Sequence, residues 1–196
     1  MLTAEQITQD LTALRDIVIQ LKAPGSPLAT KKAIVNGVEI NVFANVPENL
    51  RGVYKLGLQA ADKDFLAYED ERYTFAETLE TAEAMAQVLL GRYQINKGDR
   101  VGICSRNYPE WCLAYMAVTM IGAVVVPMNS WWQSSELVYG IQDSGARVLF
   151  ADQERIEQLA PVLDQVDVNI IAIKPAAGDE RFPEFHQLLR ESGNLP

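Results

Sequence analysis

Residues 100–151 alternate short apolar segments with longer helical ones, and turn residues stand at each change. Residues 100–105 form a short, mainly apolar segment that follows the polar turn Lys97-Gly98-Asp99, which predicts a buried strand. Residues 123–126 are rich in valine, as is typical of a central parallel strand, and residues 147–151 predict a third strand. Because helices separate the three strands, the order β-α-β-α-β predicts an α/β fold with an open, mainly parallel sheet flanked by helices.

The first helix of this run is predicted to begin at Asn107, whose side chain is placed to cap it. Pro109 falls in the first turn, and Glu110 completes an arrangement like a capping box. From residue 111 to residue 121 every residue except Thr119 is apolar, so we expect this helix to lie deep in the protein. The second helix is predicted to begin with Ser134 as its cap and to end at Gly145, and Tyr139 lies within it.

Residues 111–128 carry no charge, and by length alone they are a candidate for a membrane span. Gly122 and Pro127 interrupt the segment, and its composition changes from helix-forming residues to a run of valines. No cluster of lysine and arginine flanks it. We therefore favour a buried helix followed by a strand over a transmembrane helix.

Composition and charge narrow the class of protein. The chain has 196 residues, of which 48% are hydrophobic, and this is enough for one full core. Its formal net charge of −9 argues against binding to nucleic acid or to an anionic membrane surface. Cys104 and Cys112 fall in a predicted strand and a buried helix, and no secretory signal precedes them. We therefore expect free thiols and a cytoplasmic location.

The N-terminal part, residues 1–49, is predicted to hold a helix, a linker and a short strand. Residues 3–22 form an amphipathic helix with a capping box of Thr3 and Gln6 and an apolar stripe of Ile7, Leu11, Leu14, Val18 and Leu21. Packing of this stripe on the body of the protein is favoured over a homodimer seam, because three heptad steps are few for a coiled coil. Residues 23–33 predict the linker, and residues 38–43 a half-exposed strand.

The second part, residues 50–196, is predicted to be an incomplete α/β subdomain. Residues 65–73 predict a hairpin whose acidic turn, Glu69-Asp70-Glu71, is interpreted as solvated rather than as a metal site. We also expect a strand at 168–173 and helices at 50–61, 74–89, 154–165 and 182–189. The helix at 74–89 begins with a capping box of Thr74 and Glu77. His186 lies on the last helix and is expected to be a surface or edge residue rather than a catalyst.

Several motifs in fixed order carry a resemblance to a known family. They are Tyr73-Thr74-Phe75-Ala76-Glu77, Lys97-Gly98-Asp99-Arg100-Val101, Asn107-Tyr108-Pro109-Glu110-Trp111, Ile121-Gly122-Ala123-Val124-Val125-Val126-Pro127-Met128-Asn129, Glu136-Leu137 and Asp143-Ser144-Gly145-Ala146. Together they resemble the N-terminal part of the AMP-forming acyl-CoA synthetase superfamily, over about residues 50–155. That superfamily includes fatty-acid and aromatic-acid CoA ligases, firefly luciferase and the adenylation domains of peptide synthetases.

The resemblance implies a ligase that forms an acyl-adenylate from a carboxylic acid and MgATP and then transfers the acyl group to coenzyme A. The family's phosphate loop, adenine-binding segment, metal-binding glutamate, ribose-binding aspartate and catalytic lysine have no counterpart in this chain. We therefore expect no catalytic residue and no metal site here, and no tight binding of ATP, Mg²⁺ or CoA. The partner implied is the missing C-terminal part of the same enzyme. A stand-alone, non-enzymatic interaction domain remains the alternative, and a flavodoxin-type nucleotide binder is less favoured because no phosphate-cradling loop follows a strand.

The loop of residues 128–133 is the candidate for contact with substrate, because ligands of parallel sheets sit beyond the carboxyl ends of strands. Its candidate residues are Met128, Asn129, Trp131 and Trp132. The two tryptophans are expected to pack on something, either the core of the enzyme, an acyl or CoA channel, or an oligomer contact, of which the core is favoured. Family members often have an arginine near position 131, so Trp131 argues against phosphate binding at that point.

Overall fold

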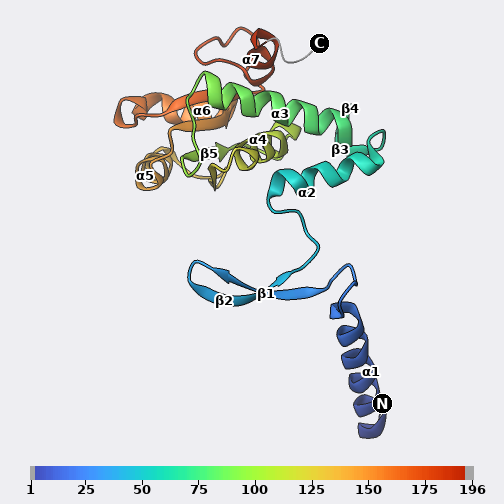
Figure 1. Cartoon of the computed structure of the whole chain (residues 1–196). Helices are drawn as coiled ribbons and strands as arrows, with labels where there is room; N and C mark the ends of the chain where they lie inside the picture. Colours follow the sequence, from blue (N-terminus) through green and yellow to red (C-terminus); the bar gives the residue numbers. More distant parts are fainter. Residues whose placement is uncertain (1–2, 193–196) are drawn as a thin grey trace. The chain divides into compact units, whose positions relative to one another are not determined.

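The computed structural model describes residues 3–192, and the chain divides into two units, Met1–Asn49 and Leu50–Pro196. The first unit holds helix α1, Ala4–Lys22, and a hairpin of strands β1, Thr30–Val35, and β2, Val38–Phe43 (Figure 1). The capping box predicted at Thr3 is present, because its side chain accepts from the Gln6 N–H and the Gln6 side chain accepts from the Thr3 N–H. The predicted N-terminal amphipathic helix is confirmed.

The linker predicted over residues 23–33 is wrong from Thr30 onward, where β1 begins. Strand β1 pairs with β2 around the turn Asn36-Gly37, whose two residues have φ angles of 49° and 81°. Asparagine and glycine tolerate this left-handed backbone, which joins two strands in a tight hairpin. An Asn-Gly pair between two apolar segments was therefore the signal for a second strand.

The second unit contains a parallel sheet of four strands. In sequence order these are β5, Arg100–Cys104, β6, Val124–Pro127, β7, Val148–Asp152, and β8, Asn169–Ile173. Their spatial order is β6-β5-β7-β8. All three pairings are parallel, which confirms the predicted fold class.

Strand β6 lies at an edge of this sheet and not at its centre, contrary to the prediction. Val124 is 48% exposed, and Pro127 at the strand's end lacks the N–H that a further neighbour would require. The valine run resembles a central strand because valine favours any pleated, half-buried surface.

Helices cover both faces of the sheet (Figure 1). Alternate residues of β7 belong to two separate apolar clusters: Phe150 packs with residues of α3, α4 and α7, and Leu149 packs with residues of α5 and α6. Because neighbouring residues of a strand point to opposite faces, the two clusters are the two sides of the sheet. These helices are α3, Phe75–Gly91, α4, Pro109–Met120, α5, Ser134–Ser144, α6, Gln153–Leu159, and α7, Phe185–Glu191.

Shorter elements precede and extend this core. Helix α2, Leu50–Leu56, continues into the 3₁₀ turn η1, Gly57–Ala60, and α6 continues into η2, Ala160–Gln165. The predicted hairpin is present as β3, Asp64–Tyr68, and β4, Glu71–Thr74. The capping box of Thr74 and Glu77 at the start of α3 is present as predicted.

Two predicted caps are wrong. Helix α4 begins at Pro109, so that Tyr108 and not Asn107 is its N-cap residue, and no side chain caps it. Proline lacks an N–H and already has a helical φ, so the first turn loses little without a cap. Ser134 is the first residue of α5, and its Oγ donates to the Gln158 carbonyl oxygen at 2.6 Å. Gln133 precedes that helix, and its N–H donates to Glu136 Oε2 at 2.9 Å.

Helix α4 is covered along its whole length, because none of its residues is exposed. Among residues 3–192, no helix has the length and apolar content needed to cross a membrane.

Candidate functional site

The carboxyl ends of β5, β6 and β7 bring three segments together at one edge of the sheet. Residues 105–108 follow β5, the 128–133 loop follows β6, and β7 leads directly into α6. The loop is tied to the sheet, because the Met128 N–H donates to the Ile103 carbonyl oxygen at 2.9 Å. This is the edge at which parallel sheets generally bind ligands.

The four candidate residues of the loop have different surroundings. Met128 is buried, and Trp132 is half-buried in the apolar cluster beneath α5. Its ring lies so near Gly140 that a Cβ atom there would come within 2.7 Å of it. Asn129 is exposed, and its Oδ1 accepts from the Trp131 N–H at 3.0 Å. Trp131 is 68% exposed, so only one of the two tryptophans packs into the core.

Arg106 lies over the exposed ring of Trp131, with its guanidinium carbon 4.0 Å from the ring centroid. Its Nη2 also donates to Glu154 Oε2 at 3.3 Å. Arg106 follows β5, and Trp131 follows β6, so the contact joins two neighbouring strand ends. A cation on an aromatic face at the carboxyl edge is a surface suited to an anionic or planar group.

Behind this surface lies a buried ion pair between Asp152 and Arg155, which we call the clasp. Arg155 is fully buried and Asp152 is 3% exposed. Arg155 Nη1 donates to both oxygens of Asp152, at 3.1 and 3.2 Å, and Arg155 Nε donates to the Ser130 carbonyl oxygen at 2.7 Å. Asp152 Oδ2 accepts from the Arg106 N–H at 2.8 Å. The clasp therefore links all three segments of the edge.

Sequence reasoning missed the clasp. Its available signal was an aspartate that ends a strand and begins a helix, a position where the side chain caps the helix. Asp152 does so, because its Oδ1 accepts from the Arg155 N–H at 3.2 Å. The bond from Arg155 to Ser130 spans 25 residues, and no local pattern predicts it.

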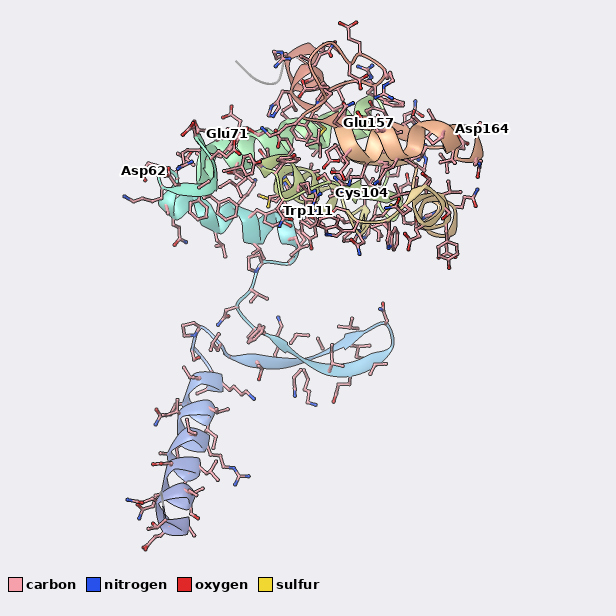
Figure 2. The ribbon with its side chains drawn as sticks, turned by 180° about the vertical axis from the view of Figure 1, so that it is seen from behind. Asp62, Glu71, Cys104, Trp111, Glu157 and Asp164 are labelled. Carbon is pink, nitrogen blue, oxygen red and sulfur yellow. The ribbon has the colours of Figure 1, made fainter. Side chains whose placement is uncertain are left out.

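The two cysteines are free thiols. Cys104 ends β5, and Figure 2 labels it within the body of the second unit. Burial raises the pKa of Cys104 to about 12, and burial also raises the pKa of Cys112. The thiolate form of Cys104 is therefore scarce at neutral pH, which argues against a nucleophilic role.

Each helix that follows a strand of the sheet has a carboxylate in its own first turn or cap. Glu136 accepts from the N–H of Gln133 before α5, Asp152 from the N–H of Arg155 in α6, and Glu184 from two N–H groups of α7 at 2.8 and 2.6 Å. In α4 the carboxylate is Glu110, which lies in the first turn, and its Oε1 pairs with His186 Nε2 on α7. These are the N–H groups and the positive dipole ends that bind phosphate in nucleotide-binding sheets. In α5, α6 and α7 the chain's own acids accept from these groups.

Glu110 is also the centre of a second buried charge group, which we call the Glu110 cluster. Glu110 is 1% exposed, and its Oε1 lies 2.9 Å from His186 Nε2 and 3.6 Å from Lys174 Nζ. Lys174 in turn donates to Glu71, which Figure 2 labels at the hairpin end of the unit. Among the residues that the structure describes, Glu110 Oε2 has no hydrogen-bond partner. Burial raises the pKa of Glu110, but the bonds from His186 and the backbone and the charge of Lys174 outweigh it, so this pKa lies below its ordinary value.

Two acidic residues that the sequence suggested were purely local features, one in a turn and one in a helix cap, contact distant parts of the chain. Glu71 pairs with Lys174 on the chain after β8, and Glu110 pairs with His186 on α7. His186 is half-buried at the edge of α7, but its link to Glu110 was not predicted. Across residues 3–192, no group of three or more His, Cys, Asp or Glu side chains is arranged to hold a metal ion.

Residues 57–192 match the family of AMP-binding enzymes. The chain belongs to this family. It is 28% identical over 141 residues to 4-hydroxybutyrate–CoA ligase 2 of Metallosphaera sedula, covering 70% of this chain and 26% of that protein. It is 30% identical over 133 residues to a mitochondrial medium-chain acyl-CoA ligase of Mus musculus, covering 67% of this chain and 22% of that enzyme. The chain therefore spans roughly a quarter of the length of these relatives.

Solved structures of CoA ligases share the fold. An anthranilate CoA ligase in complex with anthranoyl-AMP superposes with a TM-score of 0.71 at 22% identity, over 78% of this chain and 30% of that one. A benzoate CoA ligase from Burkholderia xenovorans superposes with a TM-score of 0.66 at 19% identity, over 74% and 28% of the two chains. The four-stranded sheet and its helices match the N-terminal part of the family fold.

Proposed function

We propose that this chain is the N-terminal scaffold portion of an AMP-forming acid–CoA ligase. In the complete enzyme, the carboxylate of a fatty or aromatic acid attacks the α-phosphate of ATP and releases pyrophosphate. The thiol of coenzyme A then attacks the acyl carbon, so that a thioester forms and AMP leaves. The family match over residues 57–192 and the similarity to CoA ligases support this proposal.

We further propose that the 196-residue chain does not activate an acid by itself. The observation that carries this concerns three helix N-termini, where Glu136, Asp152 and Glu184 accept from backbone N–H groups of the kind that bind phosphate in nucleotide-binding sheets. A triphosphate at any of them would meet a carboxylate, and two like charges in contact repel. ATP and Mg²⁺ therefore require groups that the rest of the enzyme supplies, and the same holds for tight binding of CoA.

The contribution of this chain is the surface formed by the 128–133 loop and Arg106. The clasp holds the loop through the Ser130 carbonyl oxygen, while Asn129 and Trp131 remain exposed at the carboxyl edge. Rigid support beneath an exposed aromatic residue suits a surface that positions a substrate. We place the acid or coenzyme A against Asn129 and Trp131, with Met128 and Trp132 as the packed base of the loop. A cytoplasmic location stays a prediction.

The test is pyrophosphate release by the purified chain with ATP, Mg²⁺ and a panel of fatty and aryl acids. We expect no release above the background without enzyme, and turnover of any acid would overturn the proposed inactivity. Calorimetric titration with ATP, AMP, CoA and flavin adds a second measurement, and we expect no heat of binding with any of the four. A saturable heat with flavin would favour a small nucleotide-binding protein instead.

Sequencing the transcript beyond the codon for residue 196 separates the scaffold from a stand-alone interaction domain. The proposal expects an open frame that encodes a Ser/Thr/Gly-rich loop ending in lysine, followed by the family's remaining segments. A stop codon at that point would overturn the scaffold role and favour the interaction domain.

A further inference from the structure

Helix α1 carries an apolar stripe that its own unit does not cover. None of its residues, from Ala4 to Lys22, is buried, and its side chains extend from all around the helix (Figure 2). The stripe residues are between 44% and 61% exposed, and they are Ile7, Leu11, Leu14, Val18 and Leu21. The family match begins at residue 57, so α1 lies outside the part of the chain that the family accounts for.

The spacing of this stripe fits a two-stranded coiled coil. Counted as heptads, Ala4, Leu11 and Val18 take position a, and Ile7, Leu14 and Leu21 take position d, so all six seam positions are apolar. The positions next to the seam carry most of the charge that decides how two such helices align. Asp10 and Ile17 stand at position g, and Arg15 and Lys22 stand at position e.

These flanking residues favour one orientation. In a parallel pair, each g residue faces the e residue of the following heptad on the other helix, which puts Asp10 opposite Arg15 twice by symmetry. Ile17 then faces the aliphatic stem of Lys22. An antiparallel pair with the same seam would put Asp10 beside Ile17 and Arg15 beside Thr8, and neither ion pair would form.

We propose that α1 binds a second copy of this chain as a parallel two-stranded coiled coil. The apolar stripe of one copy packs against the same stripe of the second copy, and the complementary charges of Asp10 and Arg15 favour this partner. A helix of 19 residues offers few heptads, so the dimer is weak and depends on protein concentration. This proposal is independent of the enzymatic one.

The test is sedimentation equilibrium of the full 196-residue chain at low salt over a range of concentrations. The wild-type chain should dimerise, and Asp10→Arg and Arg15→Asp should each raise the dimer dissociation constant about tenfold, since each turns two weak attractions into repulsions. The double variant Asp10→Arg/Arg15→Asp should return to about the wild-type value. Asp16→Arg, with the same charge change at position f on the outer face, is the matched control and should leave the constant unchanged.

Two further variants fix the surface and the orientation. Leu14→Asp, at the centre of the seam, should abolish dimers while circular dichroism shows the second unit still folded. Leu21→Cys should form an intermolecular disulfide on oxidation, at a level above the wild-type background from Cys104 and Cys112. In an antiparallel pair, position 21 would lie about 25 Å from its copy.

Several results would overturn the proposal. A chain that stays monomeric at every concentration would show that α1 packs on another segment or on a different partner. A dimer that survives Leu14→Asp would place the interface elsewhere, such as at the open edge of β6. Failure of the double charge swap to restore affinity, or of Leu21→Cys to cross-link, would rule out the parallel pairing.

Discussion

Asp152 and Glu110 are two acids of the same unit with nearly the same burial, 3% and 1% exposed, but with different partners. Both oxygens of Asp152 accept bonds, and its partner Arg155 has a side chain that is only 1% exposed. Glu110 uses one oxygen, and its partners Lys174 and His186 are 30% and 31% exposed. The Arg155 side chain therefore stays away from water and keeps only the exposed Glu154 carboxylate if Asp152 is lost, whereas the partners of Glu110 can turn toward solvent. The burial of an acidic side chain therefore does not by itself determine how much stability is lost when that side chain is removed.

The largest effect is expected for Asp152→Ala. It leaves the buried Arg155 guanidinium with only the exposed Glu154 carboxylate as a charge partner, and it also removes the cap of α6 and the acceptor of the Arg106 N–H. Breaking a buried pair from one side costs about 3–5 kcal/mol, because an uncompensated charge stays in the interior. Urea unfolding followed by far-ultraviolet circular dichroism measures the loss.

Two controls separate the buried charge from general damage. Glu154→Ala removes an exposed carboxylate bonded to the same guanidinium, and no measurable loss is expected. Asp152→Ala/Arg155→Met removes both charges and should recover part of the stability lost in Asp152→Ala. If the double variant is less stable than Asp152→Ala, then the bond from Arg155 to Ser130 matters more than the ion pair.

A smaller effect, about 1.5–3 kcal/mol at neutral pH, is expected for Glu110→Gln, which removes a charged acceptor and keeps its shape. The folded-state pKa of Glu110 lies below its ordinary value, so its charge stabilises the protein above the unfolded-state pKa. That contribution is lost as the pH falls through the folded-state pKa. Urea unfolding of both proteins from pH 7 down to pH 3 should therefore show curves that converge toward acid. A difference that stays constant with pH would mean that Glu110 acts by packing alone.

His186→Ala tests the other side of the Glu110 cluster, with an expected loss of about 1–2 kcal/mol. The bond from His186 is one of the causes that lower the pKa of Glu110, so its removal should raise that pKa. Carbon-13 detected titration of the glutamate carboxyl groups measures the change directly. His186→Gln offers a donor at a similar position and should recover part of the shift. A Glu110 pKa that does not move in His186→Ala would assign the effect to Lys174.

Much of the fold could be predicted from the sequence, because its signals are local. Turn residues and apolar spacing located the strands and helices between residues 100 and 151, and side-chain oxygens located the caps at Thr3 and Thr74. The edge position of β6 could not be predicted, because strand order depends on pairings between distant segments. Asn107 was wrongly chosen as a cap because Pro109 fixes the helix start one residue later.

The position of the candidate site could be predicted from the sequence, but the side chains that hold its loop in place could not. The rule that ligands bind beyond strand ends selected the 128–133 loop. The groups that hold it come from afar: Arg155 lies 25 residues from Ser130, and Asp152 lies 46 residues from Arg106. His186 lies 76 residues from Glu110, and no periodicity or motif joins them. Such pairs become visible only when packing brings the elements together.

The smallest effect on stability is expected at the exposed surface above the clasp. Arg106→Ala removes the cation over Trp131, a contact worth about 0.5–1 kcal/mol at exposed sites. Its backbone N–H still donates to Asp152, so the clasp should remain. The urea midpoint should move little, whereas the indole fluorescence of Trp131 should change, and Trp131→Phe identifies that signal. If Arg106→Ala instead destabilised the protein as much as Asp152→Ala, the surface and the clasp would be one structural unit. The exposed Trp131 would then be a by-product of that unit rather than a residue held outward for a ligand.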